Sequence, residues 1–297
     1  RSRIVRILVT TPAGVGPDAF ARMFAERLTQ KLGVQVLVEN KPSGNGFIAA
    51  SAARSAPADG YTVLMGVAQQ FTINPVIYDK LPYDPVADFV PLLIDAEYDT
   101  LLTVHPDVPA RNVAELVAWV KATPGGLSYA SYGTNTPSHF CGEAFKRQAG
   151  LNLTHVPYNG SPQQITNLVG GTVKIGFTAW AAVRPFVESG KLRVLATTAK
   201  TRRPQLPGVP TMLEAGYSDV IGMGWYGFFM RRGSPAEAIR RLSSEFASIG
   251  AEPAIRKRYD DLGVDPVLIP GDEVPRHLEE ETAYWRRIAQ AIGVKAE

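Results

Sequence analysis

Short apolar runs rich in β-branched residues alternate with stretches of helical period along this 297-residue chain. Short apolar or alternating runs are typical of strands, whereas apolar residues three and four positions apart indicate helices. The pattern predicts strands at residues 4–9, 35–39, 62–66, 101–104, 127–130, 154–157, 174–177, 193–197, 226–230 and 267–269. It predicts helices at residues 18–32, 47–55, 113–122, 138–149, 162–169, 236–249, 253–262 and 272–291. Strands separated by helices favour an α/β fold with parallel strands covered on both faces.

Two separated segments repeat one arrangement: a strand, a loop rich in glycine and hydroxyl groups, and a helix entered through proline. The first reads RIVRILV, TTPAGVGPD and AFARMFAERLTQKL; the second reads LSYA, SYGTNTPSH and FCGEAFKRQAG. Pro17 and Pro137 suit the first position of a helix, where the missing amide hydrogen costs nothing. The start of a helix carries unpaired amides and the positive end of the peptide dipole, and both favour an anion. We therefore expect two anion-binding loops and a ligand with two acidic groups.

Proline and glycine also gather at two places where the chain could pass between domains. These are LLTVHPDVPARNV from Leu101 and SDVIGMGWYGFFMRRG from Ser218. We predict a discontinuous first lobe of residues 1–102 and 226–297, and a second lobe of residues 103–225. Two connections of this kind form two hinge strands, and clefts between domains are favoured ligand sites.

The bulk composition narrows the function class. Hydrophobic residues make up 45% and charged residues 20%, which is enough apolar material for a proper core. The net charge is only +3, and Lys and Arg occur singly or in pairs, so the dense basic stripe typical of nucleic-acid binding is missing from the sequence. We expect no nucleic-acid partner.

The single cysteine, Cys141, excludes an internal disulfide and a thiolate zinc cluster. No apolar run reaches the roughly 20 residues that would span a bilayer. The chain opens on RSRIVRIL without a charged-then-apolar leader, so we expect either a cytosolic protein or the mature form of an exported one.

Eight distinctive segments occur in a recognisable order: PAGVGPD, ENKPSGNG, DGYTVLMG, INPVIYDKLPYDPVADF, HPDVPARNVAEL, SYGTNTPSH, HVPYNGSPQQITNLVGG and PTMLEAG. In this order the chain resembles the Bug receptors, which are periplasmic substrate-binding proteins of tripartite tricarboxylate transporters. The resemblance covers nearly the whole chain. It implies a two-lobed α/β periplasmic binding protein of the Venus flytrap type, without enzymatic activity, cofactor or metal. It also implies a periplasmic monomer that captures a small carboxylate, often a dicarboxylate, in the interlobe cleft and delivers it to membrane permease subunits.

The resemblance places the ligand between two loops, residues 11–18 and residues 131–139. On the first loop the implied backbone donors are Ala13, Gly14, Val15 and Gly16, flanked by Thr11 and Asp18. On the second loop the implied ligand-binding residues are Ser131, Asn135, Thr136, Ser138 and His139.

Departures from the family pattern bear on the ligand. The family commonly has Phe-Pro-Ala-Gly-Gly-Gly-Thr-Asp in the first loop, where Pro17 here removes a hydroxyl and an amide donor and Val15 adds bulk. Thr178 stands where the family has an Asp, which argues against an amino-acid ligand because its ammonium group would lack a counter-charge. The candidate selectors of the ligand are Gln69, Gln70, Thr178, Trp180 and Arg184. A pocket lined by tryptophan would suit an aromatic or an extended aliphatic dicarboxylate.

Neither loop contains Lys or Arg, so recognition would rest on neutral donors and helix ends. A hydrogen bond to a charged group contributes about 1.5–3 kcal/mol. Several of these, reduced by desolvation and by the cost of closure, predict reversible binding of about micromolar affinity.

A nicotinamide-dependent dehydrogenase is the alternative function. The run from Gly14 to Ala19 fits the dinucleotide fingerprint, follows a strand, opens a helix, and has Glu39 at the end of the next strand. Pro17, the second matching loop and the lack of a convincing catalytic set favour the receptor instead.

Other reactive side chains have simpler explanations. His139 and Glu143 are one helical turn apart and could ligate a metal, but no third ligand has suitable spacing. Cys141 is better explained as a buried apolar residue than as a nucleophile. His155 is expected to hydrogen-bond the backbone at a strand end. For Thr136, helix capping and ligand binding both stay open.

Overall fold

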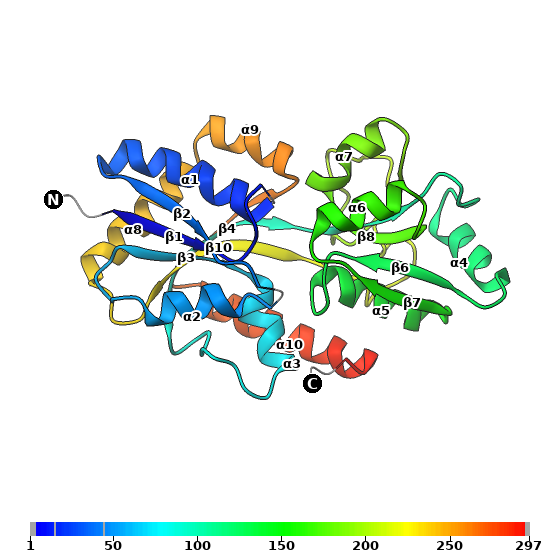
Figure 1. The fold of residues 1–297 in the computed structure, drawn as a ribbon, viewed down its shortest axis with the longest axis horizontal. Coiled ribbons are helices and arrows are strands. Elements are labelled where there is room, and N and C mark those ends of the chain that lie inside the picture. The colour runs from blue at the N-terminus through cyan, green and yellow to red at the C-terminus, as the bar shows by residue number, and fades with distance from the viewer. Residues whose placement is uncertain (1–3, 15, 44, 295–297) are drawn as a thin grey trace. The chain divides into compact units, whose positions relative to one another are not determined.

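The computed structural model describes residues 4–14, 16–43 and 45–294, and these residues form two compact units (Figure 1). The first unit comprises residues up to Glu97 together with Gly224–Arg286, and the second comprises Tyr98–Met223 together with Arg287–Val294. We predicted the connections near residues 102 and 226 and assigned the whole C-terminal segment to the first lobe. In the structure the first division falls five residues earlier, and residues 287–294 group with the second unit.

The first unit is built on a six-stranded sheet in the order β11-β4-β10-β3-β1-β2. Its strands are β1 (Val5–Val9), β2 (Val36–Asn40), β3 (Thr62–Val67), β4 (Phe89–Tyr98), β10 (Gly224–Arg231) and β11 (Asp265–Pro270). Strand β1 is parallel to both β2 and β3, whereas β10 is antiparallel to β3 and β11 is antiparallel to β4. The first unit is therefore a mixed sheet with a parallel half.

Helices cover both faces of this sheet. They are α1 (Gly16–Leu32), α2 (Phe47–Ser55), the π-helix η1 (Gln69–Ile73), α3 (Asn74–Ile77), α8 (Ala236–Gly250), α9 (Pro253–Leu262) and α10 (Val274–Ile292). Neighbouring residues on β10 serve opposite faces: Phe228 packs against Phe24 and Phe246, while Phe229 stacks on Phe71 with ring centroids 4.0 Å apart. Because both faces are apolar, β3 and β10 read as continuous hydrophobic runs.

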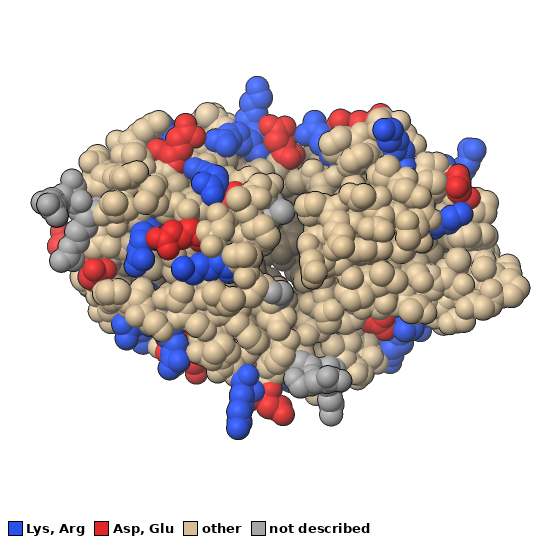
Figure 2. All heavy atoms as spheres, in the orientation of Figure 1, with Lys and Arg blue, Asp and Glu red and all other residues tan. Residues whose placement is uncertain are grey.

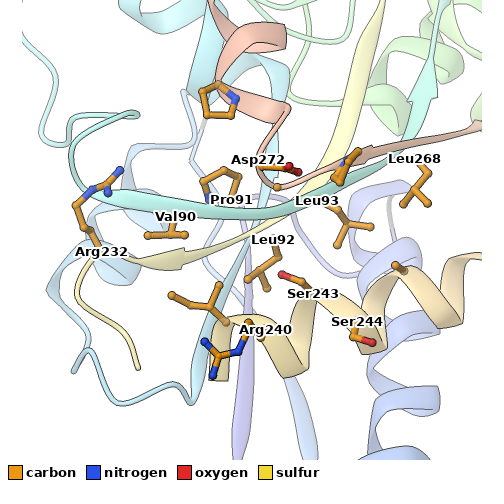
Figure 3. A pocket seen from close by; sticks show the side chains of 15 residues that line it. Val90, Pro91, Leu92, Leu93, Arg232, Arg240, Ser243, Ser244, Leu268 and Asp272 are labelled. Atoms are coloured by element: carbon orange, nitrogen blue, oxygen red, sulfur yellow. The ribbon is translucent and has the colours of Figure 1, made fainter. Parts of the chain in front are cut away.

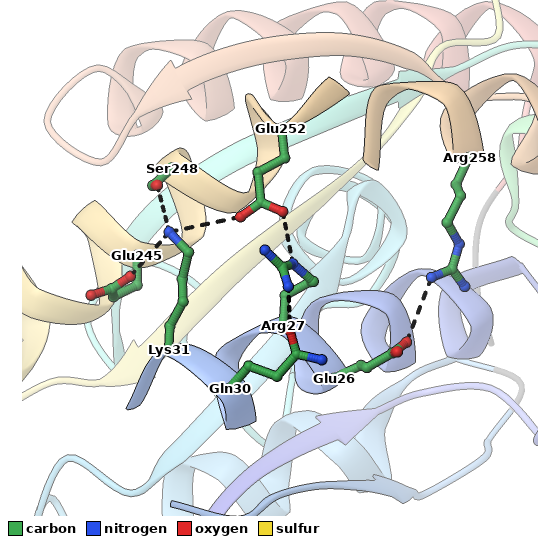
Figure 4. A network of polar contacts seen from close by, with 8 residues as sticks. All are labelled: Glu26, Arg27, Gln30, Lys31, Glu245, Ser248, Glu252 and Arg258. Atoms are coloured by element: carbon green, nitrogen blue, oxygen red, sulfur yellow. Dashed lines mark hydrogen bonds and ion pairs between the residues drawn. The ribbon is translucent and has the colours of Figure 1, made fainter. Parts of the chain in front are cut away.

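Helices α1 and α8 and the turn before α9 are also linked by charged side chains (Figure 4). Arg27 donates to Glu252 at 2.7 Å, and Lys31 donates to Ser248 at 2.7 Å while lying 3.6 Å from Glu245. These groups are partly exposed, so solvent screens each pair and its contribution to stability is small.

The second unit contains a five-stranded sheet in the order β7-β6-β8-β5-β9. Its strands are β5 (Thr100–Val104), β6 (Leu127–Ser131), β7 (Leu153–Pro157), β8 (Ile175–Ala179) and β9 (Arg193–Thr197). Its helices are α4 (Val113–Ala122), α5 (Pro137–Ala149), α6 (Ser161–Val169) and α7 (Trp180–Glu188). One apolar cluster contains Tyr129 and Phe145, and a second contains the neighbouring Ala130 and Leu168, so this sheet too has a core on each face.

Both units contain the same parallel motif. The segment β1-α1-β2-α2-β3 has strand order β2-β1-β3, and the segment β6-α5-β7-α6-β8 has strand order β7-β6-β8. In each motif the chain leaves the central strand to one side and returns on the other, and Figure 1 shows α1 and α2 on opposite faces of their sheet. The crevice beside the carboxyl end of the central strand is a topological switch point, where α/β proteins bind ligands. In both units this point is the start of the predicted anion-binding loop.

The α/β fold class is confirmed, and most predicted elements differ from the observed ones by two residues or fewer. The prediction missed β4, because Pro91, Asp95 and Glu97 interrupt its apolar pattern. It also missed α7, which contains Pro185, a residue that normally ends a helix.

The described residues include no helix with both the length and the apolarity needed to cross a membrane. On the visible face in Figure 2, acidic and basic side chains are interspersed.

We expect Gly142→Ala to destabilise the second unit. A Cβ atom at Gly142 of α5 would lie 2.0 Å from the ring of the buried Tyr129, and such overpacking costs about 1–3 kcal/mol. Gly208→Ala is the matched control, because a Cβ atom there meets nothing within 4 Å. Thermal and denaturant unfolding measure both, and equal midpoints for the two variants would contradict the packing described.

Candidate functional site

The loop of the first unit is closed by a hydrogen bond from its backbone to the third residue of α1. The amide of Gly14 donates to Oδ2 of Asp18 at 2.8 Å. Gly14 has φ +86°, a left-handed conformation that suits glycine. The chain therefore turns back on itself just before α1 begins.

Asp18 is buried and holds further groups around this loop. Arg22 donates to Oδ2 at 2.9 Å, and Asn40 donates to Oδ1 at 2.8 Å and also to the carbonyl oxygen of Thr11 at 2.9 Å. Burial acts to raise the pKa of Asp18, but the hydrogen bonds from Arg22, Gly14 and Asn40 outweigh it and lower the pKa below its ordinary 3.8. Because both carboxylate oxygens are occupied, Asp18 fixes the loop rather than offering a free acceptor.

The loop of the second unit is closed in the same way. The amide of Asn135 donates to Nδ1 of His139 at 3.1 Å, and Asn135 has φ +59°. His139 is the third residue of α5, as Asp18 is the third residue of α1, and each accepts from the residue four positions earlier. Since Nδ1 accepts, the neutral imidazole carries its proton on Nε2. We call these two contacts the loop-closing hydrogen bonds.

The hydroxyl groups of the second loop point inward. Thr136 donates to the carbonyl oxygen of Gly133 at 2.7 Å and caps α5 by accepting from the amide of His139 at 3.4 Å. Ser138 donates to the carbonyl oxygen of Phe177 on β8 at 2.6 Å. The capping prediction for Thr136 is thus confirmed. Both hydroxyl protons are engaged within the unit, so they hold the loop in place.

Three backbone amides of the second loop are available to a ligand. Within the described residues, the amides of Thr134, Thr136 and Ser138 have no hydrogen-bond acceptor. Ser138 is in the first turn of α5, Thr136 is its N-cap and Thr134 lies two residues before the cap, close to the positive end of the peptide dipole. The loop contains no Lys or Arg. The second loop therefore presents neutral donors suited to an anion.

Two histidines lie beneath this loop. Ser131, the last residue of β6, has its Oγ 2.7 Å from Nε2 of His155 on β7. The rings of His155 and His139 stack with centroids 4.1 Å apart, and Tyr129 stacks on His155 at 5.0 Å. Burial lowers the pKa of both histidines to about 4, with smaller contributions from Lys146 to His139 and from His139 to His155. Both rings are neutral near pH 7.

Three of the five predicted selectors, Gln70, Thr178 and Trp180, are buried. Gln70 of η1 donates to the carbonyl oxygen of Gly46 at 2.9 Å and accepts from the amide of Val67 at 3.2 Å, so it joins the end of β3 to the start of α2. The hydroxyl of Thr178 lies 2.8 Å from that of Thr103 on the neighbouring strand. Trp180 begins α7 within an apolar cluster.

The remaining first-loop residues lie at the carboxyl end of β1. Ala13 is exposed, Thr11 contributes the carbonyl oxygen bound by Asn40, and Val15 lies outside the described residues. Gly16 opens α1, and a Cβ atom there would come within 3.1 Å of the Tyr226 hydroxyl, so only a residue without a side chain fits comfortably.

Three residues that organise the loops were not predicted from the sequence in these roles: Arg22, Asn40 and His155. Asn40 is paired with Val9 in the β1–β2 register, and His155 with Tyr129 in the β6–β7 register. For Asn40 and His155, the signal that could have found them is a polar residue in the strand parallel to each loop-bearing strand.

A separate hollow in the first unit contains no predicted site residue (Figure 3). It measures about 690 Å³ and is lined mainly by apolar residues of β4, α8 and β11 and of the turn before α10.

Within the described residues, no three of His, Cys, Asp and Glu come together as a metal site. Glu143 instead accepts from Tyr129 at 2.8 Å and pairs with Lys146. Burial raises the pKa of Cys141 to about 12, which keeps it a thiol.

Comparison with known proteins places the chain among solute receptors. A sequence profile of the family described as "Tripartite tricarboxylate transporter family receptor" matches residues 20–294. The chain is similar to the solved structure of R. palustris Rpa4515 with adipate, with 31% identity, a TM-score of 0.93, and coverage of 99% of this chain and 98% of that one.

Two further solved structures are also similar. The periplasmic binding protein BugD is 28% identical, with a TM-score of 0.90 and complete coverage of both chains. MatC from Rhodopseudomonas palustris, solved with bound malate, is 26% identical, with a TM-score of 0.85 and coverage of 96% of this chain and 98% of that one.

Asp18→Asn should destabilise the first unit by about 1–3 kcal/mol near pH 7, because it removes the charge shared by Arg22 and the Gly14 amide. The control is Glu26→Gln on the same helix, whose exposed carboxylate lies 3.8 Å from Arg258 and should contribute less than about 1 kcal/mol. Denaturant unfolding at pH 7 compares the variants. If Asp18→Asn costs no more than Glu26→Gln, Asp18 does not anchor the loop.

The buried histidines should make the protein less stable in mild acid. Their folded pKa of about 4 lies below the ordinary 6.5, so as the pH falls through this interval the unfolded chain takes up protons that the folded chain does not. The free energy of unfolding should therefore decrease from pH 6.5 towards pH 4. A variant with both His139→Phe and His155→Phe should show a flatter dependence in unfolding experiments over this range, and an unchanged slope would show that these rings are not buried and neutral.

Proposed function

Because the chain belongs to the tripartite tricarboxylate transporter receptor family, we propose that it is a periplasmic receptor that captures a small dicarboxylate and delivers it to the membrane permease of such a transporter. The relatives solved with adipate and malate support a ligand of this class. The ligand-binding residues of this proposal are the two loops at the switch points, residues 11–18 and residues 131–139.

The observation that carries the proposal is the inward direction of the loop hydroxyls. Thr136 and Ser138 donate to carbonyl oxygens within their own unit, which leaves backbone amides as the available donors at the start of α5. An array of amides at a helix start binds a carboxylate without a cationic side chain. Such a site holds an anion firmly yet reversibly, as a receptor that must release its ligand requires.

The loop of the first unit would bind through its backbone as well, because the Asp18 carboxylate, which accepts from Gly14, Arg22 and Asn40, has no proton to donate to an anion. The dehydrogenase alternative gains no support from the contacts of Glu39, which lies 3.7 Å from Arg6 and 3.8 Å from Lys41. The family and the similar structures are binding proteins.

Calorimetry with adipate, malate and NAD tests this function. We expect saturable binding of at least one dicarboxylate with about micromolar affinity, a rise in melting temperature on binding, and no response to NAD. Hexanoate, which has the chain length of adipate but one carboxylate, is the control ligand and should bind at least about ten-fold more weakly. Saturable binding of NAD, with none of either dicarboxylate, would refute the receptor function.

A pair of substitutions at Ser138 tests recognition by the backbone. Ser138→Ala removes the hydroxyl that bonds Phe177 but keeps the amide, so it should lower stability by about 1 kcal/mol and affinity only slightly. Ser138→Pro removes the same hydroxyl and also the amide, in the first turn of a helix where proline is tolerated. It should weaken dicarboxylate binding about ten-fold beyond Ser138→Ala. Equal affinities of the two variants would exclude the amide from the site.

A further inference from the structure

We propose that His155 is a positioning residue for the anion-binding loop at residues 131–139, where it fixes the start of the loop through Ser131 and supports its end through His139. The inference deepens the proposed function and rests on it, since it concerns how the same site is held ready for a carboxylate. His155 itself lies on β7 and is not part of the loop.

The first step of the argument is the contact with Ser131. The hydroxyl of this buried residue lies 2.7 Å from Nε2 of His155, accepts from the amide of Gly133 at 3.3 Å and lies 3.1 Å from the carbonyl oxygen of Gly133. The same carbonyl oxygen accepts from Thr136, the cap of α5. A single chain of hydrogen bonds therefore runs from His155 through the loop to the start of the helix.

The second step is the stacking on His139. The two imidazole planes are inclined by only 15° with their centroids 4.1 Å apart, and His139 is the acceptor of the loop-closing hydrogen bond from Asn135. Tyr129 stacks on His155 as well, inclined by 25°, and its hydroxyl oxygen lies 3.3 Å from the carbonyl oxygen of His139. Displacing the His155 ring would thus loosen the residue that holds Asn135 in its left-handed conformation.

The strand register explains how a residue outside the loop reaches both of its ends. His155 is paired with Tyr129 in the parallel β6–β7 ladder, two residues before Ser131 and Pro157 at the ends of the two strands. A side chain at this position leans along the strand towards the carboxyl edge, where the loop begins. His155 therefore lies beneath the switch point of the second unit.

A double-mutant cycle tests the contact with Ser131, using adipate and malate as the probes. His155→Phe keeps a flat ring for stacking but removes the hydrogen bond, and Ser131→Ala removes the other partner. Each should weaken binding of the probe about 2- to 12-fold, which corresponds to the loss of one neutral hydrogen bond. The double variant should be no weaker than the weaker single variant. The proposal would be overturned if the affinity loss of the double variant equals the product of the losses of the two single variants, or if His155→Phe binds the probes with unchanged affinity.

Two more variants separate positioning from general stability. His155→Gln keeps a hydrogen-bonding side chain opposite Ser131 and should recover affinity relative to His155→Phe. His105→Phe is the matched control in the same sheet: His105 follows β5 after Val104, which pairs with Ile175 at the opposite end of β8 from Thr178. It should bind the probes as the unaltered protein does. If His105→Phe weakens binding as much as His155→Phe, the effect is not specific to the loop and the proposal is wrong.

Hydrogen exchange of the amide of Gly133 gives a readout that does not need a ligand. This amide should exchange several-fold faster in His155→Phe than in His105→Phe, because its acceptor Ser131 is no longer held. If the unaltered protein binds neither dicarboxylate but Gly133 shows this change, the proposed function fails while the positioning role of His155 stands. If Gly133 exchanges equally in both variants, the positioning role fails whatever the protein binds.

Discussion

The rest of each site depends on one contact, the loop-closing hydrogen bond that the amide of a left-handed residue donates to the side chain of the third helix residue, four positions later. Without it, the segment between strand and helix would be an ordinary flexible connection whose amides point in many directions. With it, the backbone turns before the helix starts, and the amides of the first turn are oriented before any ligand arrives. Ordering the loop in advance lowers the entropic cost of binding.

The two units solve the same geometric problem with side chains of different charge. Asp18 brings a negative charge to the start of α1, and Arg22 and Asn40 are needed to neutralise and satisfy it. His139 brings no charge to the start of α5, and its ring stacks on that of His155. An anion approaching α5 would therefore meet the positive helix end without a carboxylate in the first turn, so of the two proposed anion sites the second loop should be the stronger on electrostatic grounds.

Local patterns in the sequence were sufficient to predict the α/β class, the two repeated loops and most element bounds, because Pro17, Pro137, Gly33 and Gly150 act on the backbone within a few residues. They were insufficient for β4, whose interior carries the buried Asp95. This carboxyl group is hydrogen-bonded by the hydroxyl of Tyr259 on α9, which is far away in the sequence. The roles of Asn40 and His155 were missed as well, because they depend on strand register, which brings together residues that are far apart in the sequence. The inward direction of the Ser138 hydroxyl likewise follows from its proximity to β8, which no short motif encodes.

The proposed recognition through main-chain amides has an evolutionary consequence. Every residue except proline supplies the same amide. In the proposed function, the amino acids of the second loop could therefore vary while carboxylate binding is retained, provided that a left-handed residue and its acceptor are kept at positions 135 and 139. New preferences among organic acids would then arise from changes in the side chains around the loop, while the backbone amides that bind the carboxylate stay the same. One inherited scaffold could in this way serve many nutrients, and paralogues with dissimilar loops could still share a common mode of capture.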